Sequence, residues 1–422
     1  MHVHYQDRPW LHPSMPGHPE RAHRVAASLA GLADLPEGDC TFLPVKPVDL
    51  AAASSAHDPE YLAMLGAETF ESIRRRTLDG GDTVQAKTSL EAALEALGGA
   101  RAATDAIMSG RTRSAMLVAR PAGHHATRGQ AMGFCLLGAA GWAAIEAQRN
   151  WGARVAVLDF DLHHGNGTQD ILHDERDIFF ASTHQDGIYP GTGAASETGA
   201  HGQVMNVPLP RGSGGKVMRE AWQGIFRAVA DFHPDLILVS AGFDAHGDDP
   251  LSDLNWCLED YRWLGRQLAG LADSCCDGRI LSILEGGYDL RVLRHAVAAW
   301  ASQLCELDAP VCPAFTDAPK LAGWQSPYLG HVAVPDKDAP TEFVLRKMHR
   351  RLWIENARTG QPLWTPPDFI RLEGRELSAN LVSSANENGS LHIDAVIALE
   401  AAAGRAFGYN SGRSRDFDRK TG

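Results

Sequence analysis

Side chains that could bind a metal follow an apolar run in the stretch VLDFDLHHGNGTQD, residues 157–170. Asp161 and His163 are two residues apart, so in an extended segment both side chains would project to the same side. Asp244, at the end of another apolar run, LILVSAGFD, supplies a third ligand. Three protein ligands with an open position are typical of a catalytic zinc site. Because carboxylate and imidazole also suit iron(II) or cobalt(II), the sequence leaves the metal open.

Two adjacent histidines in AGHHA, His124 and His125, form a second reactive group. Imidazole titrates near neutrality, so either ring could carry a proton in catalysis. A catalytic imidazole needs an acceptor on its far nitrogen, and Asp159 and Asn166 are the available partners in the metal-binding segment. A carboxylate beside one histidine and an amide beside the other would make the two rings chemically unequal.

A tyrosine completes the set of reactive side chains. Tyr288 in LEGGYDL follows two glycines, and its hydroxyl could donate to a developing oxyanion. His164, next to His163, is expected to shape the turn and not to bind metal. Taken singly, each of these groups has an ordinary explanation: a solvated strand end, a surface histidine or a rim tyrosine.

Five sequence-distant polar clusters change that balance, because each directly follows an apolar run. The runs predict strands at 114–119, 154–160, 177–183, 235–241 and 279–285, and helical patterns lie at 89–110, 141–152, 217–232 and 261–275. Strands alternating with helices indicate an α/β fold with an open, mostly parallel sheet and helices on both faces. The carboxyl ends of parallel strands share one edge, so we predict that the clusters meet there in an active site.

The bulk composition limits the class of protein. A chain of 422 residues with 44% hydrophobic content can bury a full core. Its net charge of −13 argues against direct nucleic-acid binding. Seven cysteines without a C-x-x-C pair, and no signal-like or membrane-spanning segment, predict a soluble cytoplasmic protein with no membrane partner.

The end of the chain differs in composition from the rest. We predict a catalytic domain over 1–306, an extension of unknown role over 307–408 and a flexible tail over 409–422. The extension is expected to contain a Pro-rich wrap over 307–340 and helices at 341–357 and 392–408. It could cap the site or build a contact in a homo-oligomer.

The motifs as a set resemble the histone deacetylase superfamily, in the class II-like branch of bacterial deacetylases and acetylpolyamine amidohydrolases. The resemblance runs in order from near residue 17 to near residue 305. The motifs that carry it are GHPERAHRV, AHDPEYL, RPAGHHA, MGFC, DFDLHHGNGTQ, YPGTG, SAGFDAHGDDPL and LEGGYDL. After GFC most relatives have an aromatic residue and two asparagines, whereas this chain has LLGAAGW.

The resemblance implies roles for individual residues. The implied zinc ligands are Asp161, His163 and Asp244; the tandem histidines are His124 and His125 with partners Asp159 and Asn166; and Tyr288 polarises the scissile carbonyl.

The resemblance also implies how the substrate is held. Gly133, Phe134 and Tyr189 would line an acyl-lysine tunnel, and Asp82 would hold the substrate backbone at the rim. Arg21 either assists acetate release or is a buried structural arginine. A potassium ion is implied at Asp159, Asp161, His163, Ser182 and Thr183.

The chemistry implied is hydrolysis of an acylated amine, in a peptide or a small molecule, by zinc-activated water. The tandem histidines would move the protons, and acetate and an amine would result. Two alternatives stay open: a binuclear manganese ureohydrolase-like enzyme, and a non-catalytic member that binds acyl-lysine or serves as a scaffold. The sequence does not choose between acetyl-lysine, acetylpolyamines and other amides.

Overall fold

The computed structural model describes residues 1–14, 18–67 and 75–307, and the backbone of four strands between 333 and 364. A central sheet has the strand order β2-β1-β5-β10-β9-β6-β7-β8, and all its neighbouring strands pair in parallel. Its strands are β1 His2–Tyr5, β2 Thr41–Pro44, β5 Ser114–Val118, β6 Val155–Asp159, β7 Ile178–Gln185, β8 Val204–Leu209, β9 Leu236–Ala241 and β10 Ile280–Leu284. The predicted α/β architecture is therefore confirmed.

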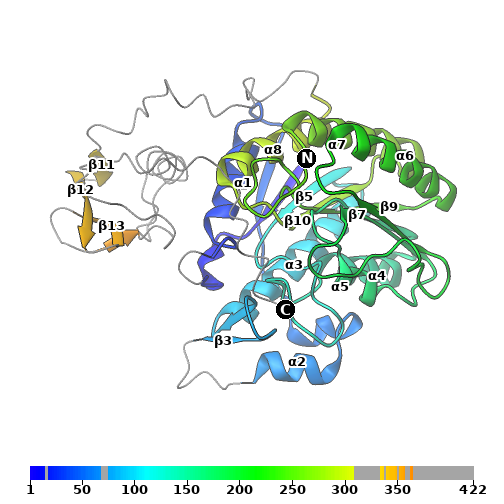
Figure 1. The fold of residues 1–422 in the computed structure, drawn as a ribbon, viewed down its shortest axis with the longest axis horizontal. Helices are drawn as coiled ribbons and strands as arrows, with labels where there is room; N and C mark the ends of the chain where they lie inside the picture. Colours follow the sequence, from blue (N-terminus) through cyan, green and yellow to red (C-terminus); the bar gives the residue numbers. More distant parts are fainter. Residues whose placement is uncertain are drawn as a thin grey trace. The chain divides into compact units, whose positions relative to one another are not determined.

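Helices cover both faces of this sheet. On one face lie α3 Ser89–Met108 and α4 Ala139–Trp151, and on the other lie α6 Gly215–Phe232, α7 Leu258–Cys276 and α8 Leu290–Leu304 (Figure 1). The inner strands β5, β6, β9 and β10 are buried at every position, which explains their continuous apolar sequences. In α6 the buried side chains recur every three or four residues, so one stripe faces the sheet.

Three strands of the sheet, β1, β2 and β8, were not predicted from the sequence. β1 has the sequence HVHY, in which two histidines interrupt the apolar pattern. β2 and β8 are the two edge strands. β2 is largely exposed, and β8 contains Pro208, which a central strand does not tolerate. An edge strand buries less surface, so its sequence carries a weaker apolar signal.

The remaining elements of this part are short. They are η1 Pro9–Leu11, α1 His23–Ala33, η2 Leu50–Ser55, α2 Pro59–Gly66, α5 Asn166–Ile171 and an antiparallel pair, β3 Arg75–Thr77 with β4 Val84–Ala86. Among residues 1–14, 18–67 and 75–307, no helix combines the length and the apolar character that crossing a bilayer requires. The cytoplasmic location stays a prediction.

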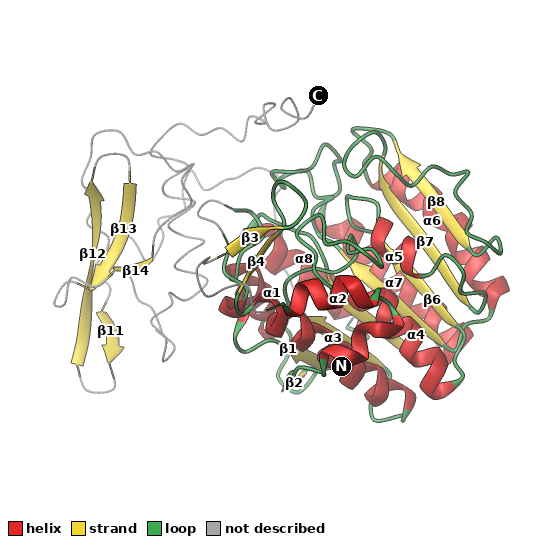
Figure 2. Cartoon of the chain, turned by 90° about the horizontal axis from the view of Figure 1, so that it is seen from below, coloured by secondary structure: helices red, strands yellow, loops and turns green. Residues whose placement is uncertain are grey.

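The C-terminal strands form a separate antiparallel sheet in the order β11-β12-β13-β14 (Figure 2). They are β11 Ala333–Asp336, β12 Ala339–Met348, β13 Arg351–Asn356 and β14 Pro362–Trp364. The predicted helix over 341–357 is therefore wrong. Phe343, Val344, Trp353 and Ile354 are residue types that favour strands, and antiparallel pairing of β12 with β13 satisfies their backbone groups.

Other predictions for the C-terminal region fall largely outside the described residues. These are the helix over 392–408, the tail over 409–422 and, apart from β11 and the start of β12, the wrap over 307–340. The domain boundary at 306 and the role of the extension stay predictions.

Candidate metal centre and active site

The predicted ligands follow neighbouring strands. β6 and β9 lie side by side, with Asp159 paired to Ser240 near their carboxyl ends. Asp161 and His163 follow β6, and Asp244 follows β9. The parallel register therefore brings these three side chains to the same edge of the sheet, as the sequence predicts.

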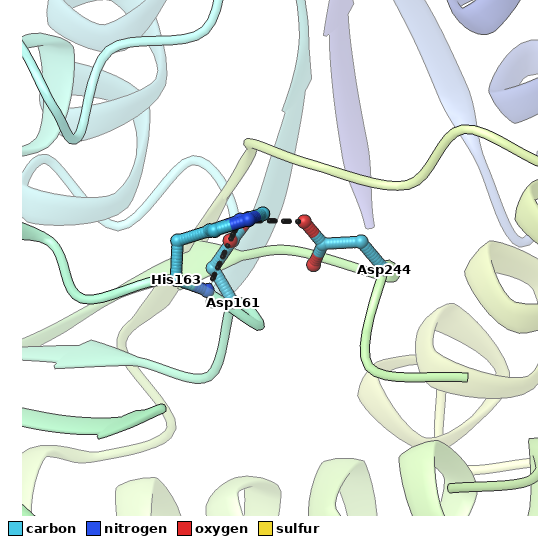
Figure 3. A group of neighbouring side chains, drawn as sticks. All are labelled: Asp161, His163 and Asp244. Carbon is cyan, nitrogen blue, oxygen red and sulfur yellow. Dashed lines mark hydrogen bonds and ion pairs between the residues drawn. The ribbon is translucent and has the colours of Figure 1, made fainter. Parts of the chain in front are cut away.

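The three side chains are close enough to share one ion (Figure 3). The Nδ1 atom of His163 lies 3.3 Å from Oδ1 of Asp161 and 3.3 Å from Oδ2 of Asp244. One ligand atom from each residue lies within 4.8 Å of the others. Asp161 and Asp244 are fully buried and His163 nearly so, with 14% of its side chain exposed.

Local bends, and not an extended strand, place Asp161 beside His163. β6 ends at Asp159, so the expected alternation of an extended segment does not apply. The backbone N–H of Asp161 donates to Oδ1 of Asp159 at 3.0 Å, and that of His163 donates to Oδ1 of Asp161 at 2.9 Å. Aspartates favour such side-chain-to-backbone turns, and here two of them in succession curl the chain around the site.

Backbone groups hold the ligand carboxylates from behind. Leu162 N–H donates to Oδ1 of Asp244 at 2.9 Å, and Gly286 N–H donates to Oδ2 of Asp161 at 2.8 Å. A Cβ at Gly286 would lie 2.2 Å from Asp244 Oδ2, and one at Gly242 would lie 2.0 Å from Asp161 Oδ2. Glycine is therefore required at both positions for the backbone to approach the carboxylates.

The tandem histidines have the unlike partners expected from the sequence. His124 Nδ1 lies 3.0 Å from Asp159 Oδ2, and His125 Nδ1 lies 2.7 Å from Asn166 Oδ1. The two rings are in contact, with centroids 4.0 Å apart and planes tilted by 42°, and the centroid of the His125 ring lies 5.8 Å from that of His163. Both histidines therefore adjoin the metal-binding group.

These surroundings separate the pKa values of the two rings. Burial, together with the charges of His124 and His163, lowers the pKa of His125 well below its ordinary value. Burial also opposes a charge on His124, but the carboxylates of Asp161 and Asp159 outweigh it and raise the pKa of His124 well above the usual value. One ring is thus suited to accept a proton and the other to keep one.

The aromatic residues named by the resemblance surround this group. Tyr189 packs edge-on against the ring of His125 at 5.2 Å, and Phe134 packs edge-on against Tyr288 at 6.1 Å. Tyr189 is 46% exposed, whereas Tyr288 is 8% exposed. Gly133 has a positive φ of 54°, and a Cβ there would meet the His125 ring at 2.2 Å. Tyr189 and Gly133 thus adjoin His125, and Phe134 adjoins Tyr288.

The other predicted site residues lie in varied positions. Asp82 is exposed on the loop between β3 and β4. Ser182 and Thr183, on β7, are buried, and Ser182 pairs with Asp159 across the sheet. His164 points away from the ligands toward Thr192 and Gln169, at 2.8 and 3.0 Å, which agrees with its expected part in the turn.

Two predictions concern other segments. The role of Arg21 stays a prediction. The LLGAAGW stretch runs into the first turn of α4, and the indole of its Trp142 is buried and donates to the carbonyl of Ala52 at 2.8 Å. This stretch therefore packs in the core of the fold.

Two buried carboxylates of the site were missed by the sequence analysis. Glu285, directly after β10, accepts from the backbone N–H of Gly123 at 2.7 Å and of His124 at 3.1 Å. Burial raises the pKa of Glu285 to about 7. Asp249 accepts from the backbone N–H of Tyr288 at 2.7 Å. The available signal was that Asp249 lies inside the polar cluster GFDAHGDDP and that Glu285 is a charged residue at the end of the apolar run RILSILE.

Comparison with known proteins identifies the family of this chain. Residues 16–304 match the family described as "Histone deacetylase domain". "Histone deacetylase 14, chloroplastic" of Arabidopsis thaliana is 43% identical over 228 residues, which cover 52% of this chain and 54% of that protein. The chain thus spans about half the length of that relative.

Two solved structures are similar to most of this chain. The crystal structure of the HDA15 HD domain superposes with a TM-score of 0.67 at 32% identity, covering 74% of this chain and 92% of that one. Acetylpolyamine aminohydrolase from Burkholderia pseudomallei gives a TM-score of 0.64 at 27% identity, covering 72% and 98%. The predicted resemblance is therefore confirmed, and the chain belongs to the histone deacetylase family.

Proposed function

We propose that this chain is a zinc-dependent deacetylase that hydrolyses the amide bond of acylated amines. The observation that carries the proposal is the meeting of Asp161, His163 and Asp244 within 4.8 Å, next to two histidines with unlike partners. Family membership supports the same reaction class.

The ligand group fits a divalent metal ion. Asp244 Oδ2 is buried without a hydrogen-bond partner, yet it lies 3.3 Å from His163 Nδ1. A buried carboxylate oxygen in that position is costly unless a cation neutralises it. Two carboxylates and one imidazole are a three-ligand set that zinc uses in catalytic sites. When bound, the ion polarises the amide carbonyl and lowers the pKa of the attacking water.

The histidines divide the proton transfers between them. Asn166 Oδ1 accepts the Nδ1 proton of His125, which leaves Nε2 free to take a proton from the attacking water. His125 then passes this proton to the departing amine nitrogen as the C–N bond breaks. His124, which is held by Asp159, keeps its proton. Its positive charge stabilises the negative charge that develops on the carbonyl oxygen.

Tyr288 completes the proposed arrangement. Its hydroxyl donates to the carbonyl oxygen as that atom gains negative charge, in addition to the field of His124. Its ring is nearly buried against Phe134, which limits competition from water. The products are a carboxylate and a free amine.

The substrate side is proposed from the resemblance. Phe134 and Tyr189 would flank an acylated aliphatic amine, and the exposed Asp82 would meet it at the rim. Acetyl-lysine and acetylpolyamines both fit this description, and the negative net charge of the chain favours cationic substrates of either kind. An acetylpolyamine enzyme among the similar structures supports including polyamines.

A monovalent cation is proposed behind the zinc. Its ligands would come from Asp159, Asp161, His163, Ser182 and Thr183. The buried hydroxyl of Thr183 has no hydrogen-bond partner, which fits an oxygen reserved for a cation.

An assay with a fluorogenic acetyl-lysine peptide tests the proposal, with Tyr288→Phe and His125→Ala as comparison variants. The wild type should hydrolyse the peptide, and each variant should lose about 100-fold or more in kcat. An acetylated polyamine, assayed by amine release, extends the test to the second substrate class. A wild type as inert as both variants on both substrates would favour the non-catalytic alternative.

A further inference from the structure

The loop that carries Tyr288 is anchored by carboxylates from two other strand ends. Gly286 N–H donates to Asp161 Oδ2 at 2.8 Å. After Gly287, the backbone N–H groups of Tyr288 and Asp289 both point at one oxygen, Oδ2 of Asp249, at 2.7 and 3.3 Å. Asp249 belongs to the loop after β9, so this single side chain joins the loops that follow β9 and β10.

The other oxygen of Asp249 is also engaged. Its Oδ1 accepts from Leu251 N–H at 3.0 Å, which fixes the carboxylate within its own loop. Asp249 is 5% exposed, so water competes little for these bonds.

The sequence before Tyr288 makes such an anchor necessary. Gly286 allows close approach to the ligand carboxylates, and Gly287 has a φ of 115°, which residues other than glycine rarely adopt. Two successive glycines leave the backbone free to take many conformations. The bonds to Asp249 come directly after this pair, where they can restrict that freedom.

We propose that Asp249 is a positioning residue, which fixes the backbone of Tyr288 so that its phenol faces the scissile carbonyl. This inference rests on the proposed role of Tyr288 in amide hydrolysis. Asp249 acts through the backbone of Tyr288 and touches neither substrate nor metal. Because misplacement of a reacting group by about 1 Å can cost roughly 100-fold in rate, the effect should be large.

Asp249→Asn tests this with little change in shape. In an amide an NH2 group replaces one of the two carboxylate oxygens. The side chain therefore cannot accept both from Leu251 N–H, which donates to Oδ1, and from Tyr288 N–H, which donates to Oδ2. With an acetyl-lysine peptide, kcat should fall about 10- to 100-fold, and KM should change less than about 3-fold. The matched control is Asp253→Asn in the same loop, whose partly exposed carboxylate pairs with Arg211 at 2.8 Å. This control should retain wild-type kcat.

A double-mutant cycle separates positioning from general stability. In the Tyr288→Phe background, Asp249→Asn should lower kcat by less than about 3-fold, because the hydroxyl it positions is already gone. An equal loss in both backgrounds, or an unchanged kcat in the single variant, would overturn the proposal. If Tyr288→Phe has the same kcat as the wild type, the proposed function is contradicted instead.

A spectroscopic readout tests the positioning without relying on turnover. The protein is labelled with 3-fluorotyrosine, and the Tyr288 signal is assigned by its loss in Tyr288→Phe. Asp249→Asn should broaden or split this 19F resonance and leave the other tyrosine signals unchanged. The control Asp253→Asn should keep the wild-type thermal unfolding. A single resonance at the wild-type position in Asp249→Asn would overturn the proposal even in an inactive protein.

Discussion

Replacing Gly286 by alanine should displace both ligand carboxylates at once. The new Cβ would lie 2.2 Å from Asp244 Oδ2 and 2.5 Å from Asp161 Oδ2. Non-bonded carbon and oxygen atoms need more than about 3 Å, so the oxygens of Asp244 and Asp161 must retreat by at least about 0.8 and 0.5 Å. Functional metal sites tolerate only about 0.2 Å in ligand distances. We therefore expect zinc affinity to fall by about 100-fold or more, which corresponds to about 2.7 kcal/mol.

Competition with a zinc chelator measures this affinity directly, and total metal analysis gives the stoichiometry. Gly270→Ala is the matched control, since its Cβ meets nothing within 4 Å on the surface of α7. The control should keep wild-type zinc affinity and gain slightly in stability. If Gly286→Ala binds zinc as tightly as Gly270→Ala, the two carboxylates are not the ligands and our explanation of this glycine is wrong.

Three other substitutions near the site have expected outcomes. Glu285→Gln removes a carboxyl whose pKa is raised to about 7. The folded wild type holds this proton more tightly than the unfolded chain does, so its free energy of unfolding should fall by about 3 kcal/mol relative to the variant as pH rises from about 4.5 through about 7. Urea unfolding at several pH values measures this. Parallel plots of unfolding free energy against pH for the two proteins would contradict it. Thr83→Val removes a hydroxyl that accepts from Phe134 N–H at 2.9 Å, so KM for the acetyl-lysine peptide should rise about 5-fold. Thr83→Ser keeps the hydroxyl and should stay near the wild-type KM. Equal KM values for the two variants would refute the idea that this hydrogen bond positions Phe134 for substrate. Asn166→Asp puts a negative charge beside His125 and raises the pKa of that ring. The acidic limb of the plot of kcat/KM against pH should therefore move to higher pH. An acidic limb at the wild-type position would argue against His125 as the general base.

The sequence was sufficient for the parts of the molecule that depend on apolar runs and on the polar residues directly after those runs. β5, β6, β9 and β10 are buried on both faces, so they have strong apolar signals. Parallel strands end at one edge, and this rule alone brings Asp161 near Asp244. The edge strands β2 and β8 have a weaker apolar signal, and β12 and β13 are recognised only by their antiparallel pairing with each other.

The residues that hold the site together from behind were harder to find. Asp249 and Glu285 accept hydrogen bonds from backbone groups of other loops, and a backbone N–H has no identity in the sequence. The bends at Asp161 and His163 have the same origin, since each depends on which N–H a carboxylate oxygen reaches. The reactive groups could therefore be proposed from the sequence, but the contacts that orient them could not.

Stepwise return of zinc to chelated protein tests the central claim most directly, with hydrolysis of an acetyl-lysine peptide and an acetylated polyamine followed at each step. If Asp161, His163 and Asp244 hold one ion, activity should vanish on chelation and return fully at one equivalent of zinc per chain. Activity that survives complete chelation, or that requires two equivalents, would contradict a mononuclear site built from these three residues.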